Sequence, residues 1–170
     1  MALQLIYDRT QADVDRVRTL AAKGWLLMTP AERDLWMNGI NGIIRGAYNI
    51  KDMNRVGDAI EFLRDILADA GYTVTVNPKT NWTRPDIPTP AQLDTYLSDV
   101  RTLRAVLPLS PDVPQVPDDM RFLTWSEAND IEKILVEIER VIISVRELWR
   151  LSGTFGSSDD VQSQKIRRAN

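Results

Sequence analysis

The chain contains no histidine and no cysteine among its 170 residues. Without cysteine, the sequence excludes disulfide bonds, thiolate nucleophiles and cysteine-based zinc or iron–sulfur sites. Without histidine, it lacks the commonest general base near neutral pH and the commonest transition-metal ligand. Catalysis would have to rest on carboxylates, lysine, tyrosine or serine, and no pair of acids lacks a structural explanation. The sequence therefore predicts no catalytic residues, no metal site and no cofactor.

Strong charge and long apolar runs are also missing. The net charge of −3 offers no basic surface for nucleic acid or for an anionic membrane. No apolar run approaches the roughly 20 residues that span a bilayer. The first residues, MALQLIYDRT, lack a basic region and a long apolar stretch, so we expect no signal peptide. Hydrophobic residues at 44% and charged residues at 26% are typical of a globular domain.

Five helix starts follow one local pattern, the capping box. A side-chain oxygen at the N-cap accepts from an unpaired backbone N–H, and an acid or amide three positions later reaches back to the N-cap. The N-caps and their partners are Thr10 with Asp13, Thr29 with Glu32, Asn49 with Asp52, Thr89 with Gln92 and Thr124 with Glu127. The predicted helices cover residues 10–22, 29–40, 49–70, 89–107 and 124–151.

Apolar residues in the two longest of these segments repeat at helical spacing. In the third segment Val56, Ile60, Leu63 and Leu67 lie on one face. The last segment carries a stripe of Ile131, Ile134, Ile138, Val141, Val145 and Leu148, which is widened by Leu135, Ile142 and Trp149. That stripe is too broad for a simple two-stranded coiled coil, and it indicates the central helix of a bundle with some surface left for a partner.

The predicted fold is mainly α, a bundle of about five helices built from two helical hairpins. YTVTV at 72–76 alternates apolar and polar residues, and it could pair with LQLIY at 3–7 as a minor two-stranded ribbon. We expect one helical domain over residues 1–152. Within it, the matching order of features over 29–86 and 89–152 indicates an internal duplication of a helix–connector–helix hairpin, with chance as the alternative.

Two helix starts also share an acid followed two positions later by asparagine. These are Asp52 with Asn54, and Glu127 with Asn129. A functional interpretation would let the acid and the amide bind a substrate or a cation. The structural interpretation gives the acid to the cap, where its charge suits the helix N-terminus, and lets each asparagine hold a neighbouring connector. Helix geometry favours the structural interpretation.

Other polar and aromatic residues give weaker indications. The acids of the last helix, Glu132, Glu137, Glu139 and Glu147, are expected on a solvated, ion-paired face. Large aromatic residues at loop edges serve as core anchors or as interface residues. We expect Trp36 and Trp149 in the core, and leave both interpretations open for Trp25 and Trp82.

The end of the chain, residues 153–170, is polar and without periodicity. A segment of this composition becomes ordered only when something holds it, so we expect a neighbouring subunit or partner to hold this C-terminal arm. The candidate partner-interface residues are Trp25, Trp82, Phe155, Val161, Ile166, Arg167 and Arg168.

The order of several motifs carries a resemblance. They are DRTQADVDRV, WLLMTPAER, GAYNIKDMNRVGDAIEFL, NWTRPDIPTPAQLDTYLSDVRTLR and LTWSEANDIEKIL, with Ser-Gly near the end. Together they resemble a small helical module of structural proteins from phages and prophages of Gram-positive bacteria, found mostly in the tail and baseplate region. The likeness covers about residues 7–156 and is most specific at 48–56, 82–97 and 123–131.

The resemblance implies a virion building block rather than an enzyme. It implies a tail, baseplate or fibre-attachment component that contacts other phage structural proteins, forms a homo-oligomer in the virion and is made in the host cytoplasm. Three alternatives stay open: a head-side fibre anchor or decoration protein, a small helical regulator that binds a host protein, and a carboxylate-dependent hydrolase. The last would need a cleft with two uncommitted acids.

Overall fold

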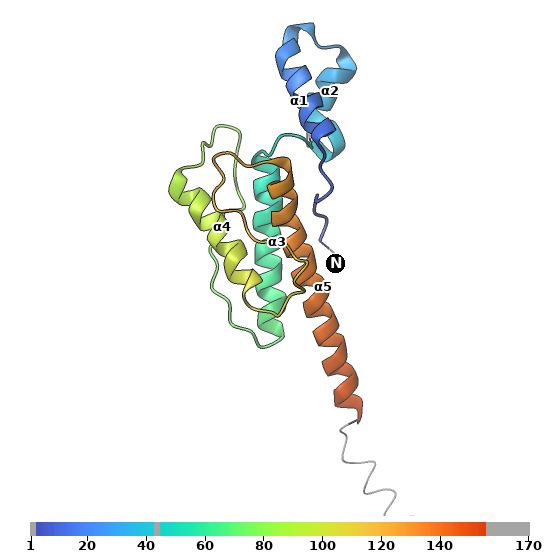
Figure 1. The fold of residues 1–170 in the computed structure, drawn as a ribbon, viewed down its shortest axis with the longest axis vertical. Coiled ribbons are helices and arrows are strands. Elements are labelled where there is room, and N and C mark those ends of the chain that lie inside the picture. Colours follow the sequence, from blue (N-terminus) through green and yellow to red (C-terminus); the bar gives the residue numbers. More distant parts are fainter. Residues whose placement is uncertain (1–2, 43–44, 156–170) are drawn as a thin grey trace, which may run out of the picture.

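The computed structural model describes residues 3–42 and 45–155, without the side chains of 38–42 and 153–155. Within these residues the chain is mainly helical, as predicted. The elements are α1 (Gln11–Lys23), a 3-10 turn η1 (Trp25–Leu27), α2 (Pro30–Gly42), α3 (Ile50–Asp69), α4 (Pro90–Arg104) and α5 (Trp125–Phe155) (Figure 1). The final helix therefore continues past residue 152, where the sequence placed the start of the polar arm.

All five predicted capping boxes are present. At the start of α5, for example, the Thr124 hydroxyl accepts from the Glu127 N–H at 3.2 Å, and the Glu127 carboxylate accepts from the Thr124 N–H at 2.8 Å. The boxes of α1, α3 and α4 have the same reciprocal form, and Thr29 with Glu32 opens α2. Because each box is a contact between residues three apart, the sequence predicts it directly.

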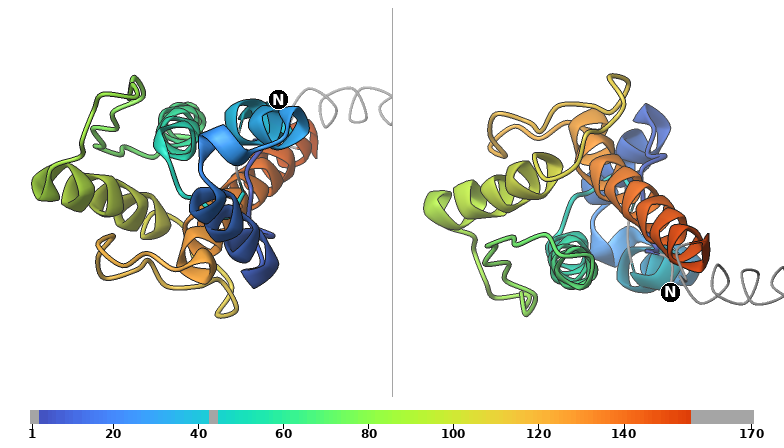
Figure 2. Two further views of the ribbon diagram at one scale, coloured as in Figure 1. Left: turned by 90° about the horizontal axis from the view of Figure 1, so that it is seen from above. Right: turned by 90° about the horizontal axis from the view of Figure 1, so that it is seen from below.

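The core lies between α3, α4 and α5, which pack against one another along their length. The views along the long axis show these three helices around a common centre (Figure 2). Its fully buried side chains come from the predicted stripes of α3 and α5 and from α4, and include Ile60, Leu63, Leu97, Leu103, Ile134 and Ile138. Burying one such side chain contributes roughly 1.5–3 kcal/mol, so this three-helix unit dominates the stability.

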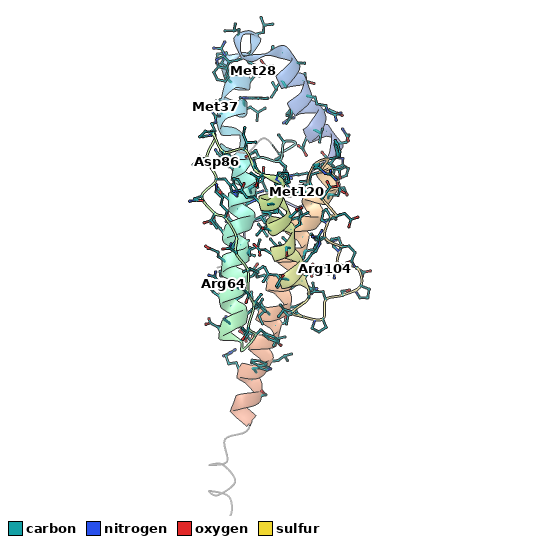
Figure 3. The ribbon with its side chains drawn as sticks, turned by 90° about the vertical axis from the view of Figure 1, so that its left-hand side faces the viewer. Met28, Met37, Arg64, Asp86, Arg104 and Met120 are labelled. Carbon is teal, nitrogen blue, oxygen red and sulfur yellow. The ribbon has the colours of Figure 1, made fainter. Side chains whose placement is uncertain are left out.

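The α1–α2 hairpin projects from one end of the three-helix unit (Figure 1). Leu20 and Met28 are buried inside the hairpin near its tip, where Figure 3 labels Met28. At its base Gly46 lies against the first turn of α1, so close that a Cβ on Gly46 would be 2.2 Å from the Asp13 carbonyl oxygen. The hairpin is therefore closed at both ends, and a glycine is required at its base.

The expected two-stranded ribbon does not form in the described residues. Residues 3–9 run over α5 and α3, whereas residues 72–82 run over α3 and α4, so the two extended segments are not neighbours. Their alternation still predicts the buried side, because Leu3, Leu5, Val74 and Val76 all pack against the core. Helix surfaces cover these side chains, and a second strand is not needed.

The structure gives the two proposed copies different surroundings. α4 packs against both α3 and α5, whereas α2 pairs with α1 in the projecting hairpin. The internal duplication stays a prediction, but α2 and α4 do not hold equivalent places.

Candidate functional site

A cluster of four charged side chains, three of them buried and Arg55 half-buried, lies where the N-terminal segment crosses α3 and α5. Its members are Arg9 from the N-terminal segment, Asp52 and Arg55 from α3, and Glu132 from α5. Arg9, Asp52 and Glu132 are at most 2% exposed. The Arg9 Nη2 lies 2.9 Å from Asp52 Oδ1 and 2.6 Å from Glu132 Oε1, and Arg55 binds the same two oxygens at 2.5 and 2.7 Å.

The cluster is balanced in charge, with two guanidinium groups and two carboxylates. Burial alone would lower the pKa of the Arg55 guanidinium, but the hydrogen bonds and charges of Glu132 and Asp52 outweigh burial and raise that pKa. A pair of tyrosines lies beside the cluster. The Tyr48 and Tyr96 hydroxyls hydrogen-bond each other, and the Arg9 guanidinium lies 5.5 Å from the Tyr48 ring centre. Burial raises the pKa of both tyrosines, so both stay protonated.

All four carboxylate oxygens of the cluster are already engaged. Asp52 Oδ2 accepts from the Asn49 N–H in the cap, and Glu132 Oε2 accepts from the Ile6 N–H at 2.6 Å and from Arg55 Nε at 3.0 Å. An acid that works as a general base needs a free oxygen facing its substrate. These four residues instead fix the N-terminal segment to the helices, and we call them the clasp.

Two further side chains of α5, those of Glu139 and Asn129, also bind the N-terminal segment. The Leu3 N–H donates to both carboxylate oxygens of Glu139, at 3.0 and 3.1 Å. The Asn129 side chain binds both the N–H and the carbonyl of Arg9, at 3.0 and 2.9 Å. Glu132 and Glu139 are therefore buried, and the expectation of a solvated face was wrong for both, because the N-terminal segment covers them.

The other asparagine of the repeated acid–asparagine pattern, Asn54, holds the connector that follows α3. The Asn54 side chain accepts from the Trp82 N–H at 2.7 Å and donates to the Trp82 carbonyl at 2.9 Å. The prediction that each asparagine holds the adjacent connector is therefore confirmed at Asn54, whereas Asn129 holds the N-terminal segment at Arg9 instead. Trp82 itself is only 5% exposed, so it belongs to the core, and its place among the partner-interface residues was wrong.

The tip of the α1–α2 hairpin presents three exposed apolar residues, Trp25, Leu26 and Leu27. They form the turn η1, and Leu26 is 87% exposed. Arg33 of α2 braces the turn, because its side chain donates to the Trp25 and Leu26 carbonyls and its guanidinium lies 5.3 Å from the Trp25 ring centre. We call these three residues the apolar tip. Trp25 stays an interface prediction.

The opposite end of the molecule carries a second exposed apolar surface. α5 is longer than α3 and α4 and extends beyond them (Figure 1). On this overhang Leu148, Trp149 and Leu151 are each more than half exposed. The expectation of a core position for Trp149 was wrong, because α3 and α4 end before they could cover it.

The remaining candidate residues cannot be placed in the same way. The side chain of Phe155 and the residues Val161, Ile166, Arg167 and Arg168 lie outside the described residues. The expectation of a core position for Trp36 was wrong: it is half-buried and lines a hollow of about 800 Å³ between α2 and the start of α3.

The spacing of two acids in α5 is a sequence signal for the clasp, but it does not identify their partners. Glu132 and Glu139 are seven positions apart and therefore share a face beside the buried stripe. Arg9 is 123 residues away from Glu132, and no local pattern links the two.

Comparison of the chain with family models, with curated proteins and with solved structures gives no match. Within the described part of the chain, no group of three or more acids is arranged to hold a metal ion. Among the described helices, none combines the length and the apolar character that crossing a membrane requires.

Proposed function

We propose that the protein is a non-enzymatic structural component of a phage virion, which joins other virion proteins through its two ends. The observation that carries this proposal is the placement of the two exposed apolar surfaces. The apolar tip and the α5 overhang lie at opposite ends of an elongated molecule. Clustered exposed apolar residues mark interaction sites, and aromatic side chains such as those of Trp25 and Trp149 are enriched at the centres of protein interfaces.

Two further features support this role. The apolar tip is held rigid by Arg33 and by an ion pair of Lys23 with Glu32, in which Nζ and Oε2 are 2.6 Å apart. A rigid surface loses little conformational entropy when it binds. The resemblance to phage tail and baseplate proteins supplies the kind of partner, and within the virion it favours a tail, baseplate or fibre-attachment position.

Mass spectrometry of purified phage particles tests the proposal. We expect the chain in the particles at a fixed number of copies, and cross-linking should identify neighbours at both ends. A protein that is abundant in infected cells and absent from particles would instead be a regulator that binds a host protein. Neighbours from the capsid or portal would move the protein to the head side.

Matched surface variants sharpen this experiment. Leu26→Ser with Leu27→Ser changes the apolar tip, and Ile87→Ser with Phe122→Ser changes two equally exposed apolar residues on connectors. Both pairs should fold normally. The tip pair should reduce incorporation into particles at least tenfold, because the proposal places these two side chains at the centre of a contact, where hot-spot residues contribute about 2 kcal/mol or more, whereas the connector pair should leave incorporation unchanged. Equal incorporation of both pairs would contradict a role for the tip.

A further inference from the structure

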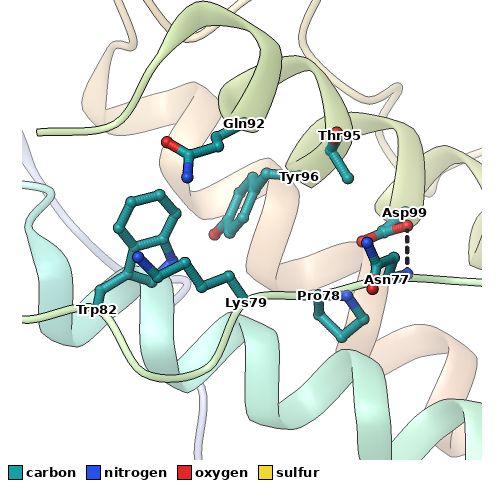
Figure 4. Close-up of a pocket in the computed structure, with 8 residues that line it drawn as sticks. All are labelled: Asn77, Pro78, Lys79, Trp82, Gln92, Thr95, Tyr96 and Asp99. Carbon is teal, nitrogen blue, oxygen red and sulfur yellow. Dashed lines mark hydrogen bonds between the residues drawn. The ribbon is translucent and has the colours of Figure 1, made fainter. Parts of the chain in front are cut away.

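A pocket of about 190 Å³ lies between α4 and the connector of residues 77–82. Figure 4 shows Trp82 at one end of it, Asp99 at the other and Tyr96 between them. Lys79 and Gln92 also line it. This volume is below that of the cavities that take drug-sized ligands, and it suits a single functional group.

Two buried polar atoms in this pocket have no hydrogen-bond partner. Asp99 is 6% exposed and Trp82 is 5% exposed. The Asp99 Oδ1 accepts from the Asn77 N–H at 3.1 Å, but its Oδ2 has no donor, and the Trp82 Nε1–H has no acceptor. An unpaired buried polar group is costly, and a ligand that pairs it regains that cost. The pocket therefore lacks one donor for Asp99 and one acceptor for Trp82.

A cationic group is the best hydrogen-bond donor for the unpaired Oδ2 of Asp99. Burial raises the pKa of Asp99, as expected for a carboxylate that no positive charge compensates. The ammonium group of Lys79, which also lines the pocket, has other partners: it lies 4.0 Å from the Trp82 ring centre and 3.3 Å from Asp86 Oδ2. The Lys79 ammonium already lies over the Trp82 ring, whereas the Tyr96 ring, which also lines the pocket, adds aromatic surface that attracts ammonium and guanidinium groups.

We infer that this pocket binds a cationic group, an ammonium or a guanidinium, that carries a hydrogen-bond acceptor close to it. The cation pairs with Asp99, and the acceptor takes the N–H of Trp82. A free small amine and an arginine or lysine residue of a partner protein share this chemistry, and in the residue the backbone carbonyl supplies the acceptor. The inference is independent of the proposed virion role.

Titration with small probes tests the inference. The probes are glycinamide hydrochloride, whose ammonium group lies beside a carbonyl acceptor, the peptide acetyl-Gly-Arg-Gly-amide and, as a neutral control, methylurea. The readouts are the indole N–H resonance of Trp82, assigned with Trp82→Phe, and the carboxyl carbon resonance of Asp99. Both should move and saturate with a cationic probe, and methylurea should move neither. Saturation by glycinamide alone indicates a free small ligand, and at least tenfold tighter binding of the peptide indicates a partner side chain.

Variants separate binding from folding. Asp99→Asn keeps an acceptor for the Asn77 N–H and so should fold, but it should weaken binding about tenfold or more, because a charged hydrogen-bond partner is lost. Asp94→Asn, on the exposed face of the same helix, is the matched control and should bind normally. If Asp99→Asn failed to fold, Thr95→Leu would narrow the pocket without changing Asp99. The absence of a saturable shift, an equal response to methylurea, or undiminished binding in the pocket variants would overturn the inference and leave a pocket for water.

Discussion

The side chain of Asn129 forms two hydrogen bonds with the backbone of Arg9, one from the Arg9 N–H and one to the Arg9 carbonyl. It substitutes for the neighbouring strand that an extended segment would otherwise need. Asn54 does the same for Trp82. Two helices with the same capped start thus use the same position to hold two connectors that are unrelated in sequence.

Loss of either asparagine side chain should destabilise the fold. Asn129→Ala and Asn54→Ala each leave a backbone N–H and a carbonyl unpaired, and we expect each to lower the free energy of unfolding by about 1–3 kcal/mol. Urea denaturation measures this quantity. The control is Asn81→Ala, an exposed residue beside Trp82, which should change stability by about 0.5 kcal/mol or less. A loss at Asn81 as large as at Asn54 would contradict the specific role of the paired hydrogen bonds.

The buried clasp should be sensitive to the loss of one charge. Glu132→Gln leaves Arg9 and Arg55 with Asp52 as their one remaining anion in the cluster, and we expect a cost of about 3–5 kcal/mol, as for other broken buried ion pairs. Glu137→Gln is the matched control on the same helix, since Glu137 pairs with the exposed Arg140, and it should cost about 1 kcal/mol or less.

Hydrogen exchange locates the effect of Glu132→Gln. The Ile6 N–H, which donates to Glu132, should exchange much faster in this variant, while amides in the middle of α4 should change only as far as global stability does. Unchanged protection at Ile6 would show that the N-terminal segment is held by other contacts.

The substitution Gly57→Ala has two effects of opposite sign on the stability of the fold. Alanine is favoured over glycine inside a helix by about 1 kcal/mol, so Gly57→Ala in α3 would stabilise an isolated helix. In the fold, however, the new Cβ would lie 2.8 Å from the Lys79 carbonyl oxygen. Because that atom is backbone, the connector must shift, and we expect a net loss of about 1–3 kcal/mol from overpacking. A thermal midpoint above that of the unchanged protein would contradict this close approach.

The ion pair at the hairpin tip should persist to low pH. The hydrogen bond from Lys23, together with the Thr29 backbone, lowers the pKa of Glu32 from 4.5 to about 2. Because the folded-state pKa is depressed, the contribution of this pair is complete above about pH 4.5 and is lost as the pH falls toward 2. A carbon-detected NMR titration of the Glu32 carboxyl group measures its midpoint. Lys23→Met should return that midpoint toward 4.5.

The contacts that sequence patterns predicted are local ones. A capping box joins residues three apart, and the buried stripe of α3 repeats every three or four residues, so the sequence places Thr124 and Leu63 without any knowledge of the fold. Alternation likewise predicts which side of residues 72–76 is buried. Alternation does not predict which element covers the buried side. A pair of helices buries Val74 as well as a second strand would.

Contacts between distant residues explain the errors. Glu139 has the polar character of a surface residue, and its burial depends on Leu3, which is 136 positions away. Trp149 lies on the same stripe as the buried Ile138, but its exposure depends on where α3 and α4 end. In both cases the deciding partner is set by chain lengths and connector paths, which periodicity within one helix does not encode.

The length of α5 has a geometric consequence. At about 1.5 Å per residue, a helix of 31 residues spans roughly 46 Å, which makes it a ruler that joins the core to whatever follows residue 155. Each residue also turns the helix by about 100°. One residue inserted at 144 would therefore move the distal part of the ruler outward by a small step and rotate it by more than a quarter turn, whereas an insertion of seven would lengthen it and nearly restore its direction. The number of residues in α5 therefore sets both the distance and the rotational orientation of anything attached to its end.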